Sequence, residues 1–299
     1  MKTITRDLGI IYDFNAQHTP IAYVESGDKV EIETYDCFQN QVKDETTEIS
    51  GINWEKINPA TGPIFVKGAM PGDILKVKIE KIDLDKQGVM VVGPGLGVLG
   101  DSFSEMEKKL LPITDEHVLF DNIKIPLNKM IGVIGVAPAG EGINCGTPGQ
   151  HGGNMDNKMM TEGATLYFPV FVEGALFGLG DMHAAMGDGE ISVSGIEVSG
   201  KATVTLEVIK GLKLEHPMLE NENEFTQIVS AETLDEAAKL ATKLMTKRIA
   251  EKSSLTLAEV TMLMSAVGQV QVCQIVDPLM TARFSVPKWL LEKLNVTLI

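Results

Sequence analysis

The chain has 299 residues, of which 44% are hydrophobic, and a formal net charge of −15 at pH 7. This length accommodates one large or two small domains with a substantial buried core. The 41 acidic residues outnumber 26 basic ones and no basic patch is visible, which argues against a nucleic-acid-binding protein. The first residues lack an apolar signal core, and no run of about 18 apolar residues occurs, so we expect a soluble cytoplasmic protein without a membrane partner.

The first half of the chain is dominated by strand patterns. Residues 21–24 and 29–35 flank a Ser-Gly-Asp turn and predict a β-hairpin, and Asp36 follows its second strand directly. A carboxylate at a strand end either caps a turn or faces a site at the mouth of a sheet. Residues 74–82 alternate strictly between polar and apolar side chains, and further apolar strands are expected at residues 89–92 and 130–138.

Between these strands the pattern is weaker. Residues 42–57 are polar and mixed, which indicates a loop or a short helix. The Gly-Pro-Gly-Leu-Gly segment at residues 93–97 lacks the G-x-G-x-x-G spacing and the following helix of a nucleotide-binding loop. Residues 98–129 are irregular and are expected to form a lid or a small insertion.

The densest polar stretch of the chain runs from residue 148 to residue 190. Two apolar runs at its centre, residues 164–172 and 174–179, predict buried strands joined by a short turn. Such a hairpin would bring its outer ends, residues 151–156 and 181–190, to one side of a sheet. The stretch therefore predicts a site built from two separate sequence positions.

The second of these ends carries the sharper chemistry. Side chains at positions i and i+2 of an extended segment face the same way, so Asp181 and His183 are expected to point together. The Gly187-Asp188-Gly189 turn would fold the chain back and present Glu190 or Asp188 to the same point. One histidine with two carboxylates suits zinc or a similar divalent ion, whereas an isolated Asp-x-His pair is often only structural.

After Glu190 the pattern changes from strands to helices. Residues 191–198 and 202–209 alternate and predict a second hairpin, whose glutamates are expected on a solvated face. The Thr-x-x-Glu capping boxes beginning at Thr233 and Thr256 predict two helices, and residues 269–276 predict a final strand. We therefore expect an α+β fold: a mainly antiparallel, sandwich-like β-sheet core over residues 1–215 and a C-terminal α-helical portion over residues 216–299 of one domain.

The chain resembles the acetamidase/formamidase family of amide hydrolases. The resemblance covers most of residues 1–285, and the run from Gly180 to Glu190 is specific in combination, although no single residue in it is. Met186 stands where the longer family members have Gln, which leaves the choice of substrate open. The matching segments are NPATGP (58–63), GAMPGD (68–73), GQHGGNMD (149–156), GATLYFPV (163–170) and GALFGLGDMHAAMGDGE (174–190), together with Asp36.

The resemblance implies hydrolysis of a small neutral amide to a carboxylate and ammonia, with a divalent metal ion that is zinc or, alternatively, calcium. On this view Asp36, Asp181, His183 and Glu190 are the metal ligands, and Asp36, His183 and Glu190 are also the candidate catalytic residues. His151, Asn154 and Asp156 are then expected to bind substrate, with Asn154 as a donor to the developing oxyanion. Because the family is oligomeric and the strands and helices are rich in apolar residues, we expect a homo-oligomer, most simply a dimer.

Two other functions are consistent with the residues. Acidic loops and a Gly-Asp-Gly turn would also suit a non-catalytic β-rich module that binds calcium or a sugar, although hard calcium sites use oxygen ligands rather than histidine. A cysteine amidase would use Cys145, which lies in a loop just before the polar stretch. The three cysteines, Cys37, Cys145 and Cys273, are odd in number and far apart, so we expect reduced, structural thiols in a reducing compartment.

Overall fold

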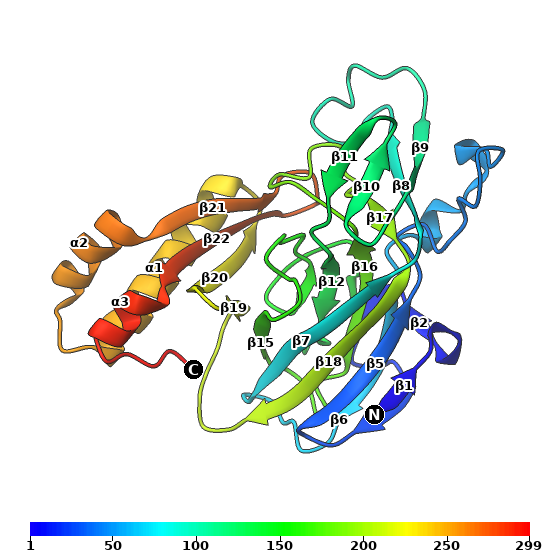
Figure 1. Cartoon of the computed structure of the whole chain (residues 1–299). Coiled ribbons are helices and arrows are strands. Elements are labelled where there is room, and N and C mark those ends of the chain that lie inside the picture. The colour runs from blue at the N-terminus through cyan, green and yellow to red at the C-terminus, as the bar shows by residue number, and fades with distance from the viewer.

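The computed structural model describes residues 1–299 and contains two nine-stranded β-sheets, with three α-helices near the C-terminus (Figure 1). The first sheet, called sheet A, runs the length of the molecule from the N-terminal strand to the C-terminal strands. In spatial order its strands are β1 (Lys2–Ile4), β5 (Asp28–Thr34), β18 (Gly200–Ile209), β7 (Ile74–Leu84), β15 (Thr165–Pro169), β19 (Met218–Glu220), β20 (Glu224–Ala231), β22 (Met280–Pro287) and β21 (Gln269–Gln274).

The second sheet, sheet B, shares a large apolar core with the first half of sheet A. Two short antiparallel pairs lie outside the sheets, namely β10 (His117–Phe120) with β11 (Ile123–Pro126) and β3 (Asp13–Phe14) with β13 (Ile143–Asn144). The strands of sheet B are β14 (Gly152–Asn154), β12 (Met130–Gly135), β16 (Phe177–His183), β17 (Glu197–Val198), β8 (Gln87–Val92) and β9 (Glu107–Pro112), with β6 (Ala60–Val66) also paired to β16 and carrying β2 (Ile10–Ile11) and β4 (Ala22–Val24).

The C-terminal part extends sheet A beyond the sandwich and covers it with helices (Figure 1). The helices are α1 (Leu234–Lys252), α2 (Leu257–Val267) and the short α3 (Lys288–Lys293). Both predicted capping boxes are present, since Thr233 and Thr256 each accept a hydrogen bond from the backbone of a glutamate three residues later. No helix is long and apolar enough to cross a lipid bilayer. The observed architecture confirms the predicted α+β class.

Three predicted hairpins are wrong, and all for the same reason. The strands β4 and β5, β15 and β16, and β17 and β18 follow each other closely in sequence, but the members of each pair lie in different sheets. Each short connection therefore carries the chain from one sheet to the other. An apolar run that is buried on both faces, such as β15 or β16, has no polar side to indicate which sheet it joins.

The segment before β12 is more regular than the sequence suggests. Residues 98–129 contain β9 and the β10–β11 hairpin rather than an irregular lid. Residues 42–57 contain two single 3₁₀ turns, Ile49–Gly51 and Trp54–Lys56, in agreement with the predicted loop or short helix. A third such turn, Arg6–Leu8, lies near the N-terminus.

Candidate active site

A buried polar cluster lies where β16 ends. Asp181 and His183 lie side by side on this strand, with 3.5 Å between His183 Nε2 and Asp181 Oδ1. The neighbouring strand β17 pairs Glu197 with His183, and Glu197 Oε1 lies 3.1 Å from the same ring nitrogen. The imidazole is fully buried and each carboxylate is at most 4% exposed, so two acidic side chains contact one histidine without water between them.

Glu190 returns to this cluster through the glycine turn that precedes it. Gly189 and Glu190 both have positive φ angles, of 102° and 47°, which reverse the chain after β16. The Glu190 carboxylate accepts a hydrogen bond from the backbone N–H of Gly195 and lies 3.8 Å from His183 Nε2. Asp188 points elsewhere, so of the two acids in this turn only Glu190 joins the cluster.

Asp156 approaches the cluster from the other polar end of the 148–190 stretch. Ligand atoms of Asp156, His183 and Glu190 all lie within 4.8 Å of one another. Close approach depends on Gly132 in β12, because a Cβ atom there would lie 2.5 Å from oxygens of both Asp156 and Asp181. Asp156 and Asp181 themselves have positive φ angles of 40° and 54°, conformations that non-glycine residues rarely adopt.

The C-terminal part contributes one further carboxylate. Asp277 lies in the turn between β21 and β22, and Gln274 orders this turn by accepting hydrogen bonds from the backbone N–H groups of Val276 and Asp277. The Asp277 carboxylate accepts a hydrogen bond of 3.0 Å from the amide of Asn154. Asp277 therefore brings a carboxylate from the C-terminal part of the chain into contact with Asn154.

Four carboxylates of this cluster, those of Asp181, Glu190, Glu197 and Asp277, line a cavity of about 290 Å³, whereas Asp156 and His183 lie behind its lining. No lysine, arginine or histidine is among its lining residues, whereas four carboxylates are. The remaining polar lining consists of side-chain amides and hydroxyls. The residues that supply the polar lining are Asn58, Asn144, Thr147, Asn154, Asp181, Glu190, Ser194, Glu197 and Asp277.

Comparison with known protein families identifies the chain. The model of the Acetamidase/Formamidase family matches residues 13–144 and 139–268. The chain belongs to this family. It is therefore an amidase, as the sequence motifs predicted, rather than a non-catalytic binding module.

Relatives and solved structures show how close the match is. A predicted acetamidase/formamidase from Thermoanaerobacter tengcongensis is 47% identical, with a TM-score of 0.97 over 99% of this chain and 98% of that one. An acetamidase from Bacillus halodurans is 46% identical, with a TM-score of 0.96 over 98% of this chain and all of that one. The formamidase of Methylophilus methylotrophus is 27% identical over 64% of this chain and 61% of its own length, so the chain spans less than two thirds of that curated relative.

The pKa values of the ionisable groups in the amidase site are shifted by burial and by neighbouring charged side chains. Burial raises the pKa of Glu190 well above its usual value, and the neighbouring Asp156 charge raises it further. Burial also raises the pKa of Asp277, with repulsion from Glu190 as the next cause. For Glu197, burial raises the pKa to about 7 although His183 opposes the shift. Burial alone would lower the pKa of His183, but Glu197 and Asp181 hold it well above the usual value.

Several polar atoms at the centre of the site have no hydrogen-bond partner in the protein. They include both carboxylate oxygens of Asp156, both ring nitrogens of His183, Asp181 Oδ1 and Glu197 Oε2. Buried carboxylates are ordinarily paired or bound to a cation, because an unpaired buried charge is costly. The one nitrogen and two oxygen donors of His183, Asp156 and Glu190, all within 4.8 Å of one another, thus fit a divalent metal ion.

Two of the predicted site residues lie apart from this donor group. Asp36 is buried, but its Oδ1 accepts a 2.6 Å hydrogen bond from the backbone N–H of Asn40, which is the turn-capping role. Burial raises the pKa of Asp36 to about 6, with Asp181 as a secondary cause. His151 does not line the cavity; its ring packs edge-on against Phe14 at 5.3 Å between centroids, and neither ring nitrogen has a partner.

None of the three cysteines has the environment of a nucleophile. Cys145 is fully buried, does not line the cavity, and directs its thiol to the backbone oxygen of Ile11. Burial raises the thiol pKa of Cys37, Cys145 and Cys273, whereas a reactive thiol needs a lowered pKa. The cysteine-amidase alternative for Cys145 is therefore contradicted by its burial.

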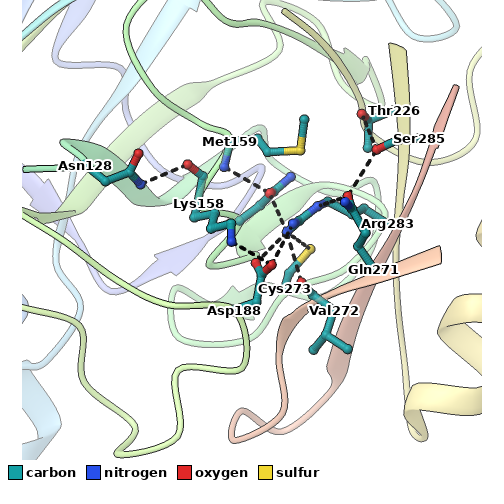
Figure 2. A network of polar contacts seen from close by, with 11 residues as sticks. Asn128, Lys158, Met159, Asp188, Thr226, Gln271, Val272, Cys273, Arg283 and Ser285 are labelled. Atoms are coloured by element: carbon teal, nitrogen blue, oxygen red, sulfur yellow. Dashed lines mark hydrogen bonds and ion pairs between the residues drawn. The ribbon is translucent and has the colours of Figure 1, made fainter. Parts of the chain in front are cut away.

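Asp188 belongs to a polar network behind the Gly187–Gly189 turn (Figure 2). The guanidinium of the fully buried Arg283 donates to both oxygens of Asp188, at 2.8 and 2.9 Å, and Lys158 contacts the same carboxylate. Arg283 also donates to the side chain of Gln271 and the backbone oxygen of Val272. The network fixes strands β21 and β22 to the turn that presents Glu190.

Two acidic residues of the site, Glu197 and Asp277, were not predicted from the sequence. Glu197 lies in an alternating segment that predicts a solvated face for its glutamates, but it is 2% exposed and contacts His183. Asp277 stands beside Pro278 at the end of a predicted strand and looks like an ordinary turn residue. The only available signal for Glu197 is its place on the strand that follows the Gly180–Glu190 motif.

Proposed function

We propose that this amidase hydrolyses a short aliphatic primary amide, of the formamide or acetamide type, with the help of a bound divalent metal ion. The observation that supports this most directly is the close group of buried donor atoms on Asp156, His183 and Glu190, in which the Asp156 oxygens and the His183 nitrogens have no hydrogen-bond partner. A nitrogen donor favours zinc over calcium, which prefers oxygen ligands. When bound, such an ion lowers the pKa of a water molecule and polarises the substrate carbonyl.

The amino acids around this donor group supply the remaining steps. Glu197, whose pKa is about 7, is suited to take a proton from the attacking water and return it to the departing nitrogen. Asp181 lies beside both His183 and Glu197 and orients them. The Asn154 amide, already held by Asp277, has a second N–H for the oxygen of the tetrahedral intermediate. The water oxygen becomes bonded to the acyl carbon, the carbon–nitrogen bond breaks, and ammonia leaves.

The absence of basic side chains from the cavity lining supports a neutral substrate. A carboxylate-bearing substrate would meet four acidic side chains and no basic one. The homodimer predicted from the sequence is retained here as part of the proposal, and light scattering at micromolar concentrations would measure it.

The proposal is tested by ammonia release from formamide, acetamide, propionamide and butyramide. The protein is assayed as purified, after dialysis against a chelator, and after return of zinc, manganese or calcium. We expect ammonia release that the chelator abolishes and that zinc restores. Ammonia release from none of the amides under any metal condition would overturn the proposal, and activity indifferent to the chelator would overturn its metal-dependent part.

A further inference from the structure

The cavity is larger than a two-carbon amide requires. Acetamide has four non-hydrogen atoms, which fill about 120 Å³ if each takes the roughly 30 Å³ of a water molecule. The cavity measures about 290 Å³, so more than half of it remains empty beside such a substrate. This remainder corresponds to about six further non-hydrogen atoms.

The extra space has an apolar lining on one side. Phe38, Ile57 and Val91 belong to one small hydrophobic cluster and also line the cavity, and the ring of Trp54 joins them. Trp54 and Phe38 meet edge to face, with 6.4 Å between ring centroids and an interplanar angle of 90°. We call Phe38, Trp54, Ile57 and Val91 the apolar wall.

The apolar wall begins directly at the reactive groups. Cys37 belongs to the same hydrophobic cluster, and its sulfur lies within 4.8 Å of carboxylate oxygens of Asp181 and Glu197. A substrate whose carbonyl lies at these carboxylates can therefore extend its carbon chain from Cys37 along Phe38 toward Trp54. Side chains along this path carry no charge.

The wall is held in place before any substrate arrives. Asn53 caps the turn that carries Trp54 by accepting a hydrogen bond from the backbone N–H of Glu55. Gln41 bonds to both the backbone N–H and the backbone oxygen of Asn53, at 2.7 and 3.2 Å. The segment from Phe38 to Ile57 is thus closed on itself, and a bound ligand does not have to order it.

We propose that the apolar wall binds the acyl chain of a larger primary amide, with an uncharged apolar or aromatic group and about ten non-hydrogen atoms in total, as in phenylacetamide. The inference rests on the proposed amide hydrolysis and extends its substrate class beyond short aliphatic amides. The chemistry is unchanged: water adds to the acyl carbon, the carbon–nitrogen bond breaks, and an arylacetate and ammonia leave. The substituent is on the acyl side because ammonia release requires an unsubstituted nitrogen.

Steady-state kinetics with acetamide, hexanamide and phenylacetamide test this inference on the metal-loaded enzyme. We expect kcat/KM for phenylacetamide to exceed that for acetamide by at least about tenfold, which is the discrimination that one or two apolar contacts give. Trp54→Ala should reduce that ratio at least tenfold, and Trp54→Phe should restore most of it. Trp289→Ala is the matched control, because Trp289 is the other tryptophan of the chain and lies exposed on α3.

The failures of the two proposals are distinguishable. If the enzyme hydrolyses acetamide but has an equal or lower kcat/KM for phenylacetamide, the inference is overturned and the proposed amide hydrolysis stands. The same holds if Trp54→Ala leaves the ratio of the two kcat/KM values unchanged. If no amide releases ammonia, binding decides: Trp289→Phe leaves Trp54 as the only tryptophan, and its fluorescence is titrated with each amide. A saturable change with phenylacetamide at concentrations where acetamide has none supports the inference, and no change overturns it.

Discussion

Arg283 in strand β22 donates a hydrogen bond to each carboxylate oxygen of Asp188, two residues before Glu190. The pair joins the C-terminal extension of sheet A to the turn that closes the site in sheet B. The same interface contains backbone hydrogen bonds from Gly189 to Cys273 and from Ile275 to Gly189. Glu190 and Asp277 therefore reach the cavity from two elements that Arg283 holds together.

Replacing Arg283 with Met should lower both stability and activity. The change removes the donor to Asp188, Gln271 and the backbone oxygen of Val272, and because Asp188 is 30% exposed and keeps Lys158, the loss should be about 1–3 kcal/mol of unfolding free energy. It also loosens the turn before Glu190, so kcat/KM for acetamide should fall in the folded protein. Chemical denaturation and ammonia release measure the two effects.

Lys158→Met is the matched control for Arg283→Met. Lys158 contacts the same carboxylate but its side chain is 41% exposed, so its loss should cost less than about 1 kcal/mol. Equal losses of stability for the two variants would contradict the role assigned to Arg283.

Gly132→Ala should damage the site more than the fold. The added methyl group would lie 2.5 Å from oxygens of both Asp156 and Asp181, so these carboxylates must move apart. Displacement by about 1 Å in an active site costs on the order of a hundredfold in rate. The measurement is kcat/KM for acetamide together with bound metal.

Gly140→Ala serves as the control for Gly132→Ala, because no atom lies within 4 Å of the position its Cβ would take. Activity of Gly132→Ala within about threefold of that of Gly140→Ala would show that the close approach of Asp156 and Asp181 is not required.

Glu197→Gln tests the proposed base. The amide keeps the size of the side chain but cannot accept the proton, so kcat should fall by about 10²- to 10⁴-fold. Bound metal should be retained, because the donor group of Asp156, His183 and Glu190 is intact. Glu207→Gln, on the exposed face of β18, should leave kcat unchanged. Loss of metal from Glu197→Gln with restored activity at high zinc would make Glu197 a ligand instead.

His151 should make the fold sensitive to mild acid. Burial lowers its pKa to about 4 from the usual 6.5, so below pH 6.5 the unfolded chain binds a proton that the folded chain refuses. The stability that this histidine contributes is complete above pH 6.5 and is lost as the pH falls toward 4, to a maximum of about 3 kcal/mol. Between pH 7.5 and 5.0 the free energy of unfolding should therefore fall more for the unmodified protein than for His151→Phe. An equal fall in the two proteins would show that His151 is not the cause.

The contrast between Glu197 and the 180–190 segment shows what the sequence could reveal. Asp181, His183 and Glu190 follow from local rules, the i+2 spacing of a strand and a glycine turn, and the structure does bring these three side chains together. Glu197 reaches the site through the pairing of β17 with β16, and Asp277 through the bridge between Gly189 and Gln274, two tertiary contacts that local patterns do not encode. The three wrong hairpins have the same cause, since partner choice in a sandwich depends on both sheets at once.

The helices were the most predictable elements because their signals are local. Thr233 and Thr256 begin α1 and α2 as the capping boxes indicate, and Ala237, Ala241 and Met245 form the buried stripe of α1. The short α3 carries no comparable cap, since Pro287 precedes it without a side-chain hydrogen bond.

Bound metal in His183→Ala, measured alongside ammonia release and the thermal midpoint, tests the central claim most directly. His183 supplies the one nitrogen donor among carboxylates, so its removal should empty the site and abolish ammonia release from acetamide while the protein stays folded. His117→Ala, in the β10–β11 hairpin far along the chain from the motif, should retain both metal and activity. Unchanged metal content in His183→Ala with a clearly lower thermal midpoint would contradict the account, because His183 would then be a structural histidine.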